Sequence, residues 1–122
     1  MRKKLLIIED NHTMSRIFKR GLEANYSVVL SSSSTEALEL FEKEKGRFDL
    51  VICDLVLPDY DGVTLIRMLS ERNRNLKFII ISGYLEIDTD SLLNNKRNIP
   101  FIQKPFYLST LRNKISEILM NA

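Results

Sequence analysis

Polar side chains that could bind a metal ion or a phosphoryl group follow four of the apolar runs in this sequence. In chain order these residues are Glu9 and Asp10, then Asp54, then Ser82, and finally Lys104. If the runs are parallel strands of one sheet, their carboxyl ends meet in the crevice where such sheets bind ligands. Three carboxylates, a hydroxyl and an ammonium group would then converge from distant parts of the chain.

The charges of this group restrict what it can do. Three carboxylates within a few ångströms of one another cannot all stay ionised without counter-charge, because each raises the pKa of the others. Lys104 supplies one positive charge, which is too little. A divalent cation that prefers oxygen ligands is the expected source of the remaining positive charge. Mg²⁺ (or Mn²⁺) is expected, since Mg²⁺ binds one or two carboxylates and keeps waters that a phosphate can replace.

A cation at this place would make the Asp54 carboxylate useful as a nucleophile towards phosphorus. Carboxylates form aspartyl-phosphate intermediates, and phosphoryl transfer needs little beyond positioning and neutralised charge on the equatorial oxygens. The metal, Lys104 and the Ser82 hydroxyl would supply those contacts. Taken singly, each residue is more often a loop former, a helix cap or a solvated side chain. The four placements taken together favour a site.

The elements that must position these residues are alternating strands and helices. Apolar runs at 5–8, 27–30, 50–53, 78–81 and 99–102 predict strands buried on both faces. Between them lie stretches with helical period, of which the one around 88–96 is expected to be short or mobile. Short right-handed crossovers then predict a doubly wound, five-stranded parallel sheet in the order 2-1-3-4-5, a flavodoxin-like three-layer α/β sandwich. Its fifth strand would lie at an edge, where Pro100 is tolerated.

Local signals place some helix boundaries. Ser33 and Glu36 predict a capping box that opens the second helix. The first helix is expected to end near Asn25. The last helix has an apolar stripe that should face the core, formed by Leu108, Leu111, Ile115 and Ile118.

Length and composition exclude several classes of protein. The 122 residues form one domain, and the formal charge of +2 is too weak to argue for direct nucleic-acid or membrane binding. The apolar run at 5–8 is too short for an export signal or a membrane span. The single cysteine, Cys53, excludes an internal disulfide, so a reducing cytoplasm is the simplest location.

At these residues the chain resembles the CheY-like receiver domain of two-component response regulators. The resemblance covers essentially the whole chain, 1–122. It rests on Glu9-Asp10 and on three segments, which are DLVLPDYDG at 54–62, ISGY at 81–84 and FIQKPF at 101–106. As a set, in this order and spacing, these motifs are very specific.

The resemblance implies a role for each residue of the metal site. Asp54 would be the phosphoacceptor and Asp10 a direct metal ligand. Glu9, which stands where aspartate is more usual, would act directly or through water. The backbone carbonyl of Val56 would be a further metal ligand.

The resemblance also implies a switch. Ser82 would bond a phosphoryl oxygen and move after phosphorylation, and Lys104 would pair with the phosphoryl group. Phe101 would be the aromatic switch, although it lacks the hydroxyl of tyrosine. The Lys104-Pro105 bond resembles one that is cis in the family.

Three residues near the phosphoacceptor have simpler explanations than chemistry. Cys53 should be a buried structural thiol, because strand alternation turns it away from the side occupied by Asp54. Asp59 and Asp61, between Pro58 and Gly62, are better explained by turn formation than by metal binding.

The expected function is a switch and not an enzyme. A histidine kinase or phosphotransfer protein would phosphorylate Asp54, and a downstream effector or output domain would read the change. A homodimer could form through the face made by the fourth helix, fifth strand and last helix. Two alternatives stay open, namely a binding module that is never phosphorylated and a flavodoxin-like flavin carrier. The carrier would need a Gly/Ser/Thr-rich loop where 9–12 reads EDNH.

Overall fold

A computed structural model describes residues 2–59, 61–83 and 99–120. The helix expected around 88–96 lies outside the described residues. Within the described ranges, no helix is both long enough and apolar enough to cross a membrane. The elements are β1 (Lys4–Ile8), α1 (His12–Leu22), β2 (Ser27–Ser31), α2 (Ser34–Lys43), β3 (Leu50–Asp54), α3 (Gly62–Arg72), β4 (Lys77–Ser82), β5 (Phe101–Gln103) and α5 (Leu108–Met120).

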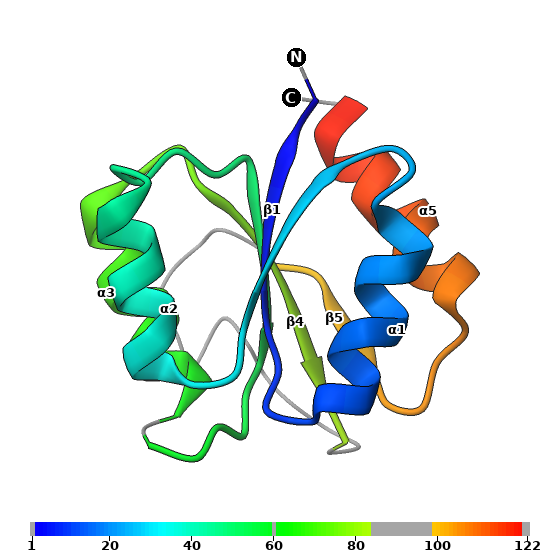
Figure 1. Ribbon diagram of the computed structural model, residues 1–122, viewed down its shortest axis with the longest axis horizontal. Helices are drawn as coiled ribbons and strands as arrows, with labels where there is room; N and C mark the ends of the chain where they lie inside the picture. The colour runs from blue at the N-terminus through cyan, green and yellow to red at the C-terminus, as the bar shows by residue number, and fades with distance from the viewer. Residues whose placement is uncertain (1, 60, 84–98, 121–122) are drawn as a thin grey trace.

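The five strands form one parallel sheet in the order β2-β1-β3-β4-β5, which confirms the predicted topology. Helices α1 and α5 cover one face of the sheet, and α2 and α3 cover the other (Figure 1). The result is a three-layer sandwich with β3 as the central strand. Because all strands run the same way, the residues that follow β1, β3 and β4 emerge at one edge.

The central strands are apolar between their ends because each contributes to two cores. In β3, Leu50 and Ile52 pack towards α1 and α5, whereas Val51 and Cys53 pack towards α2 and α3. All four side chains are fully buried. Burial raises the pKa of the Cys53 thiol, and the neighbouring Asp54 carboxylate adds to that rise. Cys53 is therefore an unreactive part of the core, as the sequence predicts.

The described part of the last helix and of the strand before it also matches the pattern of the sequence. Leu111 and Ile115 are buried, and Leu108 and Ile118 pack against the same core, so the apolar stripe of α5 faces inwards. Strand β5 lies at the sheet edge as expected, but it begins at Phe101 instead of residue 99. Pro100 has no N–H to donate to a ladder. It contributes its carbonyl instead, which accepts from the Ile80 amide at 2.9 Å.

The helix starts follow local capping chemistry. Ser33 caps α2 by accepting from the Glu36 amide at 3.1 Å, and the Glu36 carboxylate accepts in turn from the Ser32 amide at 2.8 Å. The capping box therefore closes one residue earlier than its usual form. Helix α1 begins after a cap that the sequence analysis did not identify, Asn11. It ends at Leu22, before the predicted end near residue 25.

Asp61 is the N-cap of α3, and its carboxylate accepts from the Thr64 amide at 2.8 Å. This hydrogen bond holds the pKa of Asp61 below its ordinary value of 3.8. A carboxyl group whose pKa is depressed by folding stabilises the fold above its unfolded pKa and loses that contribution as the pH falls through the folded one.

Replacing Asp61 should therefore lower the free energy of unfolding by an amount that depends on pH. Asp61→Ala is expected to lower the free energy of unfolding by about 1 kcal/mol at neutral pH. The cost should shrink as the pH falls below 3.8. Urea unfolding at neutral and acid pH measures both values. Ser33→Ala serves as the control, because a serine cap does not titrate and its cost should change less with pH. An equal cost for Asp61→Ala at both pH values would contradict the role of the charge.

Candidate functional site

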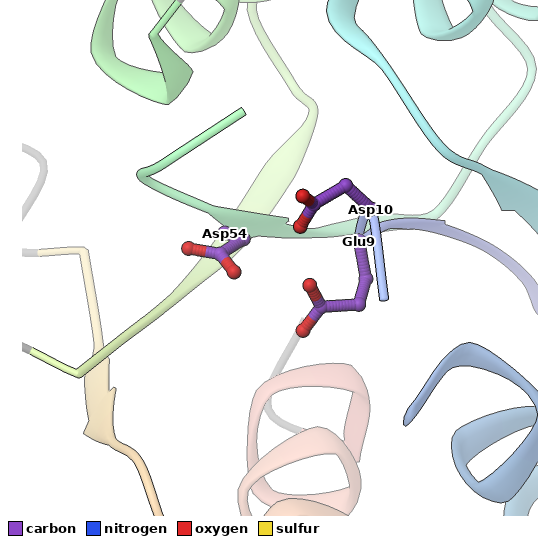
Figure 2. A group of neighbouring side chains, drawn as sticks. All are labelled: Glu9, Asp10 and Asp54. Carbon is purple, nitrogen blue, oxygen red and sulfur yellow. The ribbon is translucent and has the colours of Figure 1, made fainter. Parts of the chain in front are cut away.

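The carboxylates of Glu9, Asp10 and Asp54 converge where β1 and β3 end. One oxygen from each lies within 4.8 Å of the others. Figure 2 shows the acidic pair that follows β1 lying beside Asp54 at the end of the neighbouring strand. The register pairs Ile8 with Cys53, so the acidic pair and Asp54 leave the sheet at the same level. The structure thus brings together side chains that are about forty-five positions apart in sequence.

Lys104 joins two of these carboxylates. Its Nζ donates to Glu9 Oε1 at 2.6 Å and to Asp54 Oδ2 at 2.7 Å. The backbone of the same residue is fixed against β4, because the Lys104 amide donates to the Ser82 carbonyl at 2.7 Å. The Lys104-Pro105 peptide bond is cis, as the family resemblance implies. The end of β4 therefore holds the lysine over the acidic group.

The site combines burial with an excess of negative charge. Glu9 is 1 % exposed and Asp54 is 5 % exposed, whereas Asp10 lies at the surface. Burial raises the pKa of Glu9, the Asp54 charge raises it further, and the hydrogen bond from Lys104 opposes the rise without cancelling it. Burial alone would lower the pKa of Lys104, but its hydrogen bonds to Asp54 and Glu9 outweigh that effect and raise it. Both shifts mean that the site favours extra positive charge.

This donor set fits a divalent cation. Three carboxylates supply the hard oxygen ligands that Mg²⁺ and Mn²⁺ prefer. In the described ranges, Lys104 is the one basic side chain that pairs with them, which leaves more negative than positive charge. Asp10 is exposed, so the group opens to solvent on one side. The acidic group is therefore compatible with a divalent metal site.

The segment after β3 is held against the Asp54 carboxylate by its own backbone. The Val56 amide donates to Asp54 Oδ1 at 3.0 Å, and the Gly62 amide donates to the Leu55 carbonyl at 2.9 Å. A Cβ added at Gly62 would lie 2.5 Å from the Asp54 carbonyl oxygen and 2.9 Å from Leu55 Cα. The start of α3 therefore lies directly on the backbone of the candidate phosphoacceptor. The sequence alone does not predict this role for Gly62.

The residues expected to act as a switch lie on the neighbouring strands. Ser82 ends β4 and is fully buried, one strand away from Asp54. Phe101 begins β5, is half-buried and packs against the core on the α2 and α3 side. The side chain of Val56 is 53 % exposed, so the surface beside Asp54 is partly apolar.

The two other aspartates of the segment do not belong to the acidic group. Asp61 caps α3, and the carboxylate of Asp59 binds the start of α2. Turn formation, which the sequence predicts for both, is therefore only part of their role, because each also stabilises the start of a helix. The contact of Asp59 with Ser34 and Thr35 was not predicted, because it depends on how α2 packs beside the segment after β3, for which the spacing of residues carries no signal.

Comparison with known proteins identifies the family. The family model of the response regulator receiver domain matches residues 5–116. The chain is 35 % identical over 116 residues to the sensor kinase CckA of Brucella abortus (strain 2308), covering 94 % of this chain but 12 % of that protein. It is 31 % identical over 121 residues to the response regulator receiver protein CpdR of the same organism, covering 98 % of this chain and 99 % of CpdR.

A solved structure agrees with these sequence relatives. The crystal structure of a CheY-like response regulator receiver domain protein from Methanospirillum hungatei JF-1 superposes with a TM-score of 0.87 at 27 % identity. The match covers 99 % of this chain and 96 % of that one. The sheet order, the acidic group and these matches agree, and the chain belongs to the response regulator receiver domain family.

Proposed function

We propose that this domain is a phosphoacceptor switch in which Asp54 receives a phosphoryl group from a histidine kinase or a phosphotransfer protein. The observation that carries the proposal is the position of the Asp54 carboxylate, which is buried beside two other carboxylates and bonded to Lys104. Aspartates with a purely structural role are seldom buried beside other carboxylates, because like charges destabilise one another. A nucleophile for phosphorus needs this arrangement of an anion among groups that neutralise charge.

The residues of the site would divide the work between them. Asp10, Asp54 and the Val56 carbonyl, with Glu9 directly or through water, would hold Mg²⁺ (or Mn²⁺). When bound, the cation would neutralise charge on the phosphoryl oxygens. Lys104 would pair with the same oxygens. An Asp54 oxygen would form the new bond to phosphorus as the bond from phosphorus to the imidazole nitrogen of the donor breaks.

Phosphorylation would then change the surface that partners recognise. The Ser82 hydroxyl would bond a phosphoryl oxygen, and Phe101 would move as that hydroxyl moves. The partners would be a kinase or phosphotransfer protein and a downstream effector or output domain, with a homodimer through β5, α5 and the helix expected around 88–96 as a further assembly. The chain spans 12 % of the sensor kinase relative and 99 % of CpdR, so either a stand-alone regulator or part of a longer protein accords with the proposal. We place this switch, which is not an enzyme, in the cytoplasm.

The proposal is tested by incubating the protein with a small-molecule phosphodonor and MgCl₂, followed by intact-mass measurement. We expect one phosphoryl group on the wild type, and none on Asp54→Asn or in the presence of EDTA. Asp49→Asn is a useful control, because Asp49 precedes β3 at the other end of that strand, where it accepts from the Lys4 amide, and this variant should still be modified. An unmodified wild-type protein would instead favour a binding module that is never phosphorylated.

A further inference from the structure

Asp59 makes a contact that links the candidate site to α2. Its Oδ1 accepts from the Ser34 amide at 2.9 Å, and its Oδ2 accepts from the Thr35 amide at 2.8 Å and the Thr35 hydroxyl at 2.5 Å. Helix α2 already has its own cap, Ser33. Asp59 is therefore a second cap that reaches α2 from another segment of the chain, and we call these three hydrogen bonds the Asp59–α2 contact.

The segment that carries Asp59 is also the segment that touches Asp54. It begins with the hydrogen bond from the Val56 amide to Asp54 Oδ1 and ends where Asp61 caps α3. Val56 and Asp59 are three positions apart, so movement at one is transmitted over a short length of backbone. The Val56 backbone beside Asp54 and the carboxylate held by α2 are thus joined by a short stretch of chain.

The Asp59–α2 contact is strong although Asp59 is exposed, because it joins a carboxylate to a helix N-terminus. A carboxylate at a helix N-terminus meets the positive end of the helix dipole. Hydrogen bonds from amides and a hydroxyl to an ionised acceptor are stronger than those between neutral groups. The α2 N-terminus also lies in a helix with a buried face, in which Ser34, Ala37 and Phe41 are buried, so it is a firm anchor for the segment.

We propose that Asp59 is a positioning residue of the phosphoacceptor site, which it serves by anchoring the Val56 backbone to α2. The inference rests on the function proposed above. It has a reciprocal consequence, since two linked binding events must affect each other by the same factor. Binding of a cation by Asp54 and the Val56 carbonyl should tighten the Asp59–α2 contact, so the N-terminus of α2 responds to the state of the site.

A titration with MgCl₂, followed through amide chemical shifts in NMR spectra, tests the first half of the inference. We expect Asp59→Ala to raise the Mg²⁺ dissociation constant about fivefold, the lower end of ordinary coupling between sites. Ser33→Ala is the matched control, because it removes a cap from the same helix without touching the segment beside Asp54. Both variants should unfold at lower urea concentrations, but Ser33→Ala should bind Mg²⁺ like the wild type.

Hydrogen exchange tests the reciprocal half. In the wild type, saturating MgCl₂ should slow exchange of the Ser34 and Thr35 amides several-fold, and in Asp59→Ala it should leave their exchange unchanged. Thr35→Val, which removes the hydroxyl and keeps both amide bonds, gives a milder variant should Asp59→Ala fail to fold. It should weaken Mg²⁺ binding in the same direction, and Thr35→Ser should restore it.

The outcomes separate this inference from the function on which it rests. A wild-type protein that neither binds Mg²⁺ nor accepts a phosphoryl group overturns the proposed function, and the positioning role falls with it. A wild type that does both, with Asp59→Ala and Ser33→Ala binding Mg²⁺ equally, overturns the positioning role alone. Asp59 would then be a structural cap.

Discussion

Lys104→Met is expected to lower the free energy of unfolding by about 3 kcal/mol in Mg²⁺-free buffer, because removing one partner of a buried ion pair leaves uncompensated charge. Here one ammonium compensates two carboxylates, Glu9 and Asp54, both almost fully buried. Methionine keeps an unbranched apolar side chain as long as the stem of lysine and lacks only the ammonium group, so the loss reports the charge and its hydrogen bonds. The value is placed at the lower end of the usual range because the Lys104 side chain is 23 % exposed.

Urea unfolding with EDTA and then with MgCl₂ measures this loss. Mg²⁺ should recover part of the stability of Lys104→Met, because a cation that binds the native state adds to its stability. Lys114→Met is the matched control, since Lys114 pairs with Glu117 on the surface of α5 and such pairs contribute about 0.5 kcal/mol or less. Equal losses for the two variants would show that Lys104 does not stabilise the buried carboxylates.

Gly62→Ala is expected to lower the free energy of unfolding by about 2–3 kcal/mol, as overpacking of a tight contact does. The atoms that the new Cβ would meet, the Asp54 carbonyl oxygen and Leu55 Cα, belong to the backbone and cannot rotate away. Relief therefore requires α3 to move away from β3, which would displace the phosphoacceptor. We expect slower modification of Asp54 by a phosphodonor in addition to the loss of stability.

Thermal unfolding and the intact-mass assay measure these two effects. For a domain of this size, the loss should lower the midpoint of thermal unfolding by roughly 5–15 °C. Gly83→Ala is the control, because a Cβ at Gly83 would meet nothing within 4 Å. A Gly62→Ala protein as stable as Gly83→Ala would contradict the close approach of α3 to Asp54.

The parts of the fold that the sequence predicted are those with a periodic or local signal. Continuous apolar runs such as 50–53 arise because a central parallel strand is buried on both faces, and that pattern is visible in one dimension. Ser33 and Glu36 predicted the start of α2 because a capping box is a local signal between residues close in sequence. The start of β5 was predicted too early, since Ile99 is buried as a strand residue would be but precedes a proline that cannot donate to the ladder.

The candidate site was predictable to the extent that topology alone brings strand ends together. That reasoning, without any distance, was enough to group Glu9, Asp10 and Asp54. It could not predict that Lys104 bonds two of these carboxylates at once, because side-chain reach depends on the path of the backbone after β5. The contacts of Asp59 with α2 and of Gly62 with the Asp54 backbone depend on how helices pack, for which the spacing of residues carries no signal.

The geometry of the lysine ammonium has a consequence for how the reaction could begin. An ammonium group has three N–H donors, and Lys104 uses one for Glu9 and one for Asp54. The third N–H can donate to the oxygen of an arriving group while both existing bonds stay intact. Within the part of the chain that the structure describes, both bonds of the Lys104 ammonium go to carboxylates. An arriving phosphoryl oxygen would thus meet a cation that is already held in place, and neither ion pair would have to break first.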